Sequence, residues 1–113
     1  MSNRQRADLF AQYVGLELKG RIVSQGSNAT AVANFIGRSP SAFNRWLNGK
    51  AEIPLAVLCQ ACEAIDIDPT LVVDYAYNRM AVVLGERNGE KYDPDVVTGA
   101  IEEVAGFEGS AGE

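Results

Sequence analysis

Residues 26–50 read GSNATAVANFIGRSPSAFNRWLNGK and hold the start and stop signals of two short helices. Asn28 is predicted to cap the first helix, because its side-chain oxygen can accept a hydrogen bond from a free backbone N–H. Gly37 is predicted to end that helix, since glycine adopts the left-handed conformation at low cost. Ser39 then caps a second helix with Pro40 at its first position, where a backbone N–H is not needed. The pattern predicts two short helices separated by a tight turn.

The second of these helices has an apolar and a polar face. Phe43 and Trp46 are three residues apart, so both are expected to point toward the core. The opposite face carries hydrogen-bonding side chains, namely Ser41, Asn44, Arg45 and Asn48, together with Ser39 at the helix start. Such a face is typical of a helix that lies in the DNA major groove, where Arg pairs with guanine and Asn with adenine.

The segments on either side of residues 26–50 also show apolar residues at helical spacing. The segment from Ser2 to about Ser24 is either one long helix or two short ones, with Gly15 and Gly20 as possible breaks. The dipeptide Ile53-Pro54 begins a fourth helix. Its predicted apolar stripe comprises Leu55, Leu58, Cys59, Cys62 and Ile65.

Two further helices are expected toward the C-terminus. Asp68-Pro69 caps and starts a fifth helix, which carries a broad apolar face and ends at Asn88-Gly89. Asp93-Pro94 begins a sixth, short helix, and the tail from Gly106 is expected to be frayed. The sixth helix carries Val97, Ile101 and Val104. Because strand signals are nearly absent, the predicted fold class is all-α, with five helices and a C-terminal extension of one short helix.

Composition and charge place the chain among single soluble globular domains. It has 113 residues, of which 47% are hydrophobic and 22% charged. The net charge of −5 is distributed unevenly along the chain. Residues 1–50 contain seven Lys or Arg and two Asp or Glu, whereas residues 51–113 contain three Lys or Arg and 13 Asp or Glu. This asymmetry suggests that the basic first half of the chain contacts nucleic acid and that the second half is an acidic segment that does not.

Several other classes of protein are disfavoured. The chain has no histidine, so the commonest general base is missing, and no nucleophile has a visible base; an enzyme is therefore not expected. Cys59 and Cys62 have the spacing of half a zinc site without a second half, so core packing is predicted, with no metal and no cofactor. No apolar run approaches the roughly 18 residues of a membrane span, and no signal peptide is visible. We expect a cytoplasmic protein without a membrane partner or a disulfide.

The segment 26–50 resembles, without a gap, the helix-turn-helix of the lambda-repressor, Cro and XRE-like family, and the resemblance covers roughly residues 14–75. The matching positions are the small Ala33, the apolar Ile36, the turn glycine Gly37, the N-cap Ser39, the apolar Phe43 and Trp46, and the closing Gly49. Ala29 and Pro40 depart from the family, since each replaces a polar side chain that relatives use near DNA. Ile22 and Leu47 replace a buried Arg–Glu pair, an exchange that costs little stability or increases it.

The resemblance implies a sequence-specific double-stranded DNA-binding transcriptional repressor, of the phage-immunity or Cro-like kind, with a recognition helix at about residues 39–48 in the major groove. The candidate base-reading residues are Ser39, Ser41, Asn44 and Arg45. The candidate phosphate-binding residues are Arg38, Asn48, Lys50, Lys19 and Arg21. Arg4 and Arg6 are expected to form a basic N-terminal arm or to cap the first helix.

The predicted organisation is a basic helical extension (1–13), a DNA-binding domain (14–87) and an acidic C-terminal extension (88–113). The apolar residues between Tyr75 and Leu84 exceed what a minimal core needs, which suggests a homodimer seam. In the alternative, the sixth helix folds back on the same chain. Two other functions fit the same sequence: an antitoxin that binds a basic toxin through its acidic half, and a recombination accessory factor that bends DNA.

Overall fold

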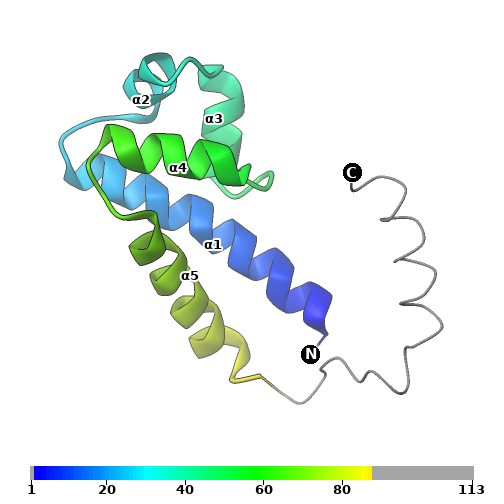
Figure 1. Ribbon diagram of the computed structural model, residues 1–113. Helices are drawn as coiled ribbons and strands as arrows, with labels where there is room; N and C mark the ends of the chain where they lie inside the picture. Colours follow the sequence, from blue (N-terminus) through cyan, green and yellow to red (C-terminus); the bar gives the residue numbers. More distant parts are fainter. Residues whose placement is uncertain (1, 88–113) are drawn as a thin grey trace, which may run out of the picture.

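The computed structural model describes residues 2–87, which form five α-helices and no strand (Figure 1). The helices are α1 (Asn3–Ser24), α2 (Ala29–Phe35), α3 (Pro40–Leu47), α4 (Leu55–Ala64) and α5 (Pro69–Leu84). The all-α prediction is confirmed for this part of the chain. The predicted sixth helix and the frayed tail lie outside the described residues. None of the described helices combines the length and the apolar character of a bilayer span.

Helix α1 is one continuous helix, so neither Gly15 nor Gly20 breaks it. It begins with a capping box, in which the Gln5 backbone N–H donates to Ser2 Oγ at 3.1 Å and the Ser2 backbone N–H donates to Gln5 Oε1 at 2.8 Å. Helix α5 runs antiparallel along α1, and α2, α3 and α4 gather at the C-terminal end of α1 (Figure 1). The α1–α5 pair is therefore the scaffold on which the shorter helices sit.

The predicted helix boundaries in residues 26–50 are confirmed. Asn28 accepts from the Ala31 N–H at 2.9 Å, and Ser39 accepts from the Ala42 N–H at 3.3 Å. Gly37 has a φ of 74°, in the left-handed region. The predicted end of the fifth helix is wrong: α5 ends at Leu84, because Gly85 takes a φ of 88° before Asn88-Gly89 is reached.

The core is apolar and contains residues from all five helices. Its largest fully buried side chains are Phe43, Leu18, Ile22, Leu47, Met80, Val57, Val72 and Cys62. The stripe predicted on α4 is partly wrong, since Leu55 is 80% exposed and Cys59 is also exposed, whereas Val57 and Ala61 are buried. The helix is rotated about its axis relative to the prediction, because it packs against both α2 and α5.

Arg6 joins the start of α1 to the end of α5. Its side chain is only 7% exposed, and Nη1 donates to the Gly85 carbonyl at 2.7 Å. A guanidinium at the C-terminus of α5 also lies at the negative end of the helix dipole. Arg6 therefore belongs to the packed interface, and the prediction of a basic arm is wrong for this residue. The predicted boundary between residues 13 and 14 falls inside α1.

Candidate nucleic-acid interface

Helix α3 is anchored by its apolar side. Phe43 and Leu47 are completely buried, and the Trp46 ring packs edge-on against Phe43 with ring centroids 6.4 Å apart. Trp46, predicted to point to the core, is only half-buried. The apolar side of α3 thus fixes the orientation of the helix and turns its polar side outward.

The outward side of α3 presents Ser41 and Arg45, which are one helical turn apart and both exposed. Neither side chain has a hydrogen-bond partner among residues 2–87. Asn48, one turn further along, is exposed as well. A helix that presents an unengaged Arg and Ser in this way can offer hydrogen bonds to the edges of base pairs.

The other two candidate base readers have partners within α3 itself. The Ser39 hydroxyl caps the helix, although its own proton stays available to donate. Asn44 is half-buried, and its Nδ2 donates to the Pro40 carbonyl at 3.0 Å. Asn44 also lines a cleft of about 390 Å³ between α1, α2 and α3, whose apolar lining includes Ile22 and Leu47. Among the four candidate base readers, Ser39 and Asn44 therefore make hydrogen bonds within α3, whereas the side chains of Ser41 and Arg45 make none among residues 2–87.

Lys19 is held at the end of α3. Its Nζ donates to Asn48 Oδ1 at 2.6 Å, which joins α1 to the residue that caps the C-terminus of α3. The ammonium group is exposed, and the amide of Asn48 still has its two N–H donors. Lys19 and Asn48 thus form one polar unit beside the outward face of α3, and both side chains are exposed to solvent.

Arg21 lies on the other side of α1. Its Nε donates to Glu17 Oε2 at 2.9 Å, and its guanidinium lies over the Tyr75 ring of α5, 4.9 Å from the ring centre. Residues 19 and 21 project about 200° apart around a helix, so they cannot serve the same surface. The structure does not bring Arg21 to the outward face of α3.

Two further cations lie at the ends of α3, and both Arg38 and Lys50 are exposed. Arg38 Nε donates to Gln60 Oε1 of α4 at 3.2 Å, so α4 positions the residue that precedes the N-cap of α3. The sequence carried no signal for Gln60, because the contact joins residues 22 positions apart in different helices. Four exposed cations therefore lie on α3 or near its ends, namely Arg38, Arg45, Lys50 and Lys19.

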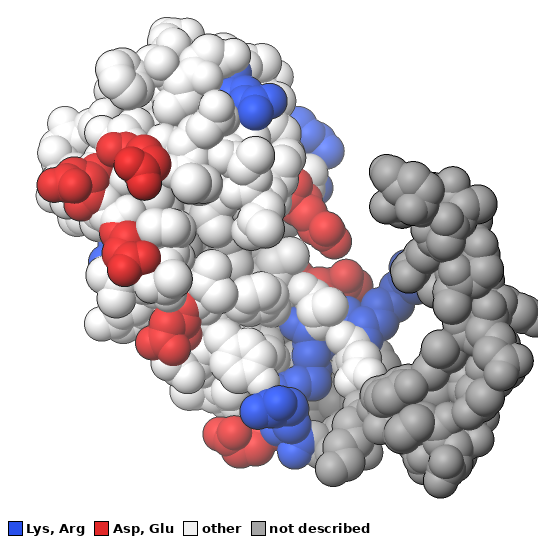
Figure 2. Space-filling model, in the orientation of Figure 1, with Lys and Arg blue, Asp and Glu red and all other residues white. Residues whose placement is uncertain are grey.

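Many of the acidic residues lie on another part of the described molecule, although Asp8 and Glu52 line a hollow together with Lys50. Figure 2 shows acidic side chains gathered over the region where α4 leads into α5. Basic side chains lie on the α3 side and toward the start of α1 and the end of α5, with further acidic side chains between these two places. The exposed acids of the α4–α5 region are Glu63, Asp66, Asp68 and Asp74. The acids between α4 and α5 thus lie apart from the outward face of α3, which makes approach of a polyanion from the α3 side more favourable than approach from the α4–α5 side.

A scan against protein-family models and searches of curated proteins and of solved structures find no match. The function is therefore inferred from the chemistry and placement of the side chains on α3 and around it. The cysteines do not contribute to this surface: both are free thiols, Cys62 in the core and Cys59 exposed on α4.

Proposed function

We propose that this protein is a sequence-specific double-stranded DNA-binding transcriptional regulator. In this proposal α2 and α3 form a helix-turn-helix, and the outward side of α3 lies in the major groove. The single observation that carries the proposal is the exposure of Ser41 and Arg45, one turn apart, on a helix that Phe43 and Leu47 lock into the core. A rigid helix with unengaged hydrogen-bonding side chains suits base reading.

The residues around α3 divide into two roles. Arg45 has the geometry to donate two hydrogen bonds to guanine O6 and N7, and Ser41 suits several base edges or a phosphate. Lys19, Arg38 and Lys50 surround that helix with positive charge and are assigned to the phosphate backbone, which sets register and carries no sequence information. Base reading therefore rests on fewer side chains than the sequence predicted, because Asn44 is engaged with the Pro40 carbonyl.

The regulator acts as a repressor that occludes a promoter by binding an inverted repeat as a homodimer. An apolar stripe on α5 supports the second copy: Leu71, Tyr75 and Val82 are all exposed and recur on one side of the helix. A two-fold pair of recognition helices about 34 Å apart would fit two successive major-groove faces.

Selection of bound sequences from a random DNA pool tests the proposal directly. We expect enrichment of a palindromic consensus whose half-sites lie about one helical turn apart. The affinity for the enriched DNA should fall steeply with salt, since neutralised phosphates release counterions. A pool that shows no enrichment over many rounds would rule out sequence-specific binding, and a consensus without symmetry would rule out the dimer.

A further inference from the structure

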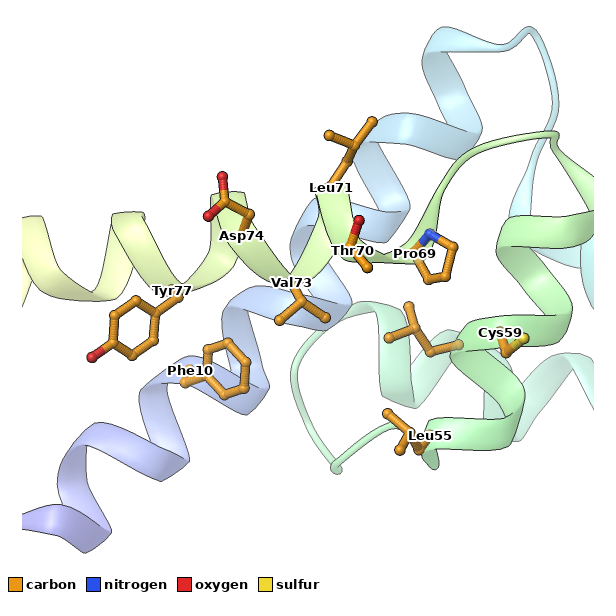
Figure 3. Close-up of a pocket in the computed structure, with 10 residues that line it drawn as sticks. Phe10, Leu55, Cys59, Pro69, Thr70, Leu71, Val73, Asp74 and Tyr77 are labelled. Carbon is orange, nitrogen blue, oxygen red and sulfur yellow. The ribbon is translucent and has the colours of Figure 1, made fainter.

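A second surface, unrelated to α3, is an apolar groove of about 800 Å³ formed by α1, α4 and α5. Figure 3 shows Phe10 beside Val73 and Tyr77 at one end of the groove, with Leu55 and Cys59 at the other. Apolar side chains make up most of its lining, and Leu55 is largely exposed there. An apolar hollow of this size on a small domain is typical of a surface that binds another molecule or another segment of the chain.

The groove lies on a different side of α1 from the outward face of α3. Phe10 packs edge-on against Tyr77 of α5 with ring centroids 6.0 Å apart, whereas Gly15 contacts α3. These two positions project about 140° apart around α1. An element seated in the groove would therefore leave Ser41 and Arg45 exposed.

The chain continues from a point close to the groove. Arg6 holds Gly85 at the end of α5, and residues 88–113 follow outside the described part. Tyr77 and Leu71 lie about 10 and 20 Å back along α5 from Leu84, from the rise per residue of a helix. Residues 88–93 are six residues of linker and extend up to about 20 Å, which is enough for a segment that begins at residue 94 to return to the groove.

The sequence of that C-terminal segment has the chemistry that the groove requires. Val97, Ile101 and Val104 recur at the spacing of one helical face. The acids Asp95, Glu102 and Glu103 would fall on the other side of such a helix, in water. This arrangement keeps them away from Asp74, the one acid in the lining of the groove.

We propose that residues 94–105 dock in this groove as an amphipathic helix of the same chain, with Ile101 seated among Phe10, Leu58 and Val73. The proposal does not depend on DNA binding. A covalently linked segment has an effective concentration of the order of millimolar, so even weak apolar docking is favoured over capture of a second molecule. Of the exposed stripe on α5, Leu71 also lines this groove, whereas Tyr75 and Val82 do not line it and remain available to a second copy.

The Cys59 thiol provides the test, because it is exposed on α4 and lines the groove. The second cysteine does not interfere: burial raises the pKa of the Cys62 thiol to about 11, so it holds little reactive thiolate near neutral pH. The experiment measures the rate at which Cys59 of the full chain reacts with a small disulfide reagent, in the unaltered protein and in Ile101→Asp. Glu103→Ala is the matched control, since it alters the same segment on the side away from the groove.

We expect Ile101→Asp to raise the Cys59 reaction rate about tenfold or more, where tenfold corresponds to about 1.4 kcal/mol of lost docking free energy. Glu103→Ala should leave the rate unchanged, and the rate of the unaltered protein should not depend on protein concentration. Val97→Asp should repeat the effect of Ile101→Asp, and circular dichroism should show in these two variants no more than the loss of one short helix. Equal rates in the unaltered protein and Ile101→Asp would overturn the proposal. Protection that increases with protein concentration would also overturn it, because a second copy would then occupy the groove.

Discussion

Gly15 of α1 lies directly against the backbone carbonyl of Trp46 in α3, and a methyl group on Gly15 would overlap that oxygen. Two helices approach so closely only where one of them has no side chain at the crossing. The contact sets the rotation of α3 on the α1–α5 scaffold, and with it the outward direction of Ser41 and Arg45. A glycine inside a long helix, which intrinsically weakens the helix, is explained by this packing.

Gly15→Ala should therefore destabilise the protein by about 1 to 3 kcal/mol, as is usual for overpacking, because the Trp46 backbone cannot move aside as a flexible side chain would. Gly20→Ala is the matched control: it lies in the same helix, and nothing stands within 4 Å of the added carbon. That variant should gain about 0.5 to 1 kcal/mol from better helix propensity. Urea denaturation measures both values, and a Gly15→Ala protein as stable as Gly20→Ala would contradict the packing argument.

Arg6→Ala should lower the free energy of unfolding by about 1.5 to 3 kcal/mol, the usual value for a hydrogen bond to a charged group. The variant loses the bond to the Gly85 carbonyl and the packing of the buried side chain. Arg4→Ala removes the same charge from an exposed position of the same helix and should change stability by no more than about 0.5 kcal/mol. Similar losses for the two variants in chemical denaturation would show that Arg6 does not join α1 to α5.

Arg45→Ala should cost about 1 to 3 kcal/mol of affinity for the selected DNA and relax preference at one base pair. Arg79→Ala provides a charge-matched control, because Arg79 stacks on the Tyr13 ring, 4.2 Å from its centre, away from α3. Its effect should be small and equal for all sequences. Fluorescence anisotropy titrations with the consensus and with single-base variants measure both effects. Equal losses for the two substitutions would remove Arg45 from base reading.

The Cys62 thiol should make the stability of the protein depend on alkaline pH. Its pKa is raised from 9.0 to about 11 in the folded chain, first by burial and then by the neighbouring Cys59. Above pH 9 the unfolded chain loses the thiol proton while the folded chain keeps it, so the free energy of unfolding falls as pH rises toward 11. Cys62→Ala should remove this part of the slope. Parallel stability curves for the two proteins between these pH values would exclude the effect.

Val82→Asp should prevent the homodimer without unfolding the protein, because Val82 is 84% exposed and a charge there meets water in the monomer. In a dimer the same charge would be buried without a partner, which is strongly unfavourable. Sedimentation equilibrium measures the change, with Val83→Asp as the control, because Val83 is also exposed but projects about 100° away from Val82 around α5. A Val82→Asp protein that associates as strongly as the unaltered chain would place the dimer seam elsewhere.

Local signals predicted the helix boundaries well where the deciding interactions span only a few residues. Asn28 and Ser39 cap their helices through N–H groups three residues away, so the sequence pattern contains the whole interaction. The end of α5 was missed because Gly85 offers a weaker local signal than Asn88-Gly89, while its carbonyl is held by Arg6 from the other end of the chain. The rotation of α4 was missed because two other helices decide which of its sides is buried.

For the candidate site, helical spacing alone was enough to place Ser41, Arg45 and Asn48 on one side of a short helix and Phe43 on the other, because a helix repeats every 3.6 residues whatever surrounds it. Spacing carries no information about neighbours that are distant along the chain. Packing between helices joined Lys19 to Asn48 and turned Arg21 toward Tyr75. It also brought α3 against Gly15. These contacts depend on the positions of whole helices relative to one another, and only the folded chain determines those positions.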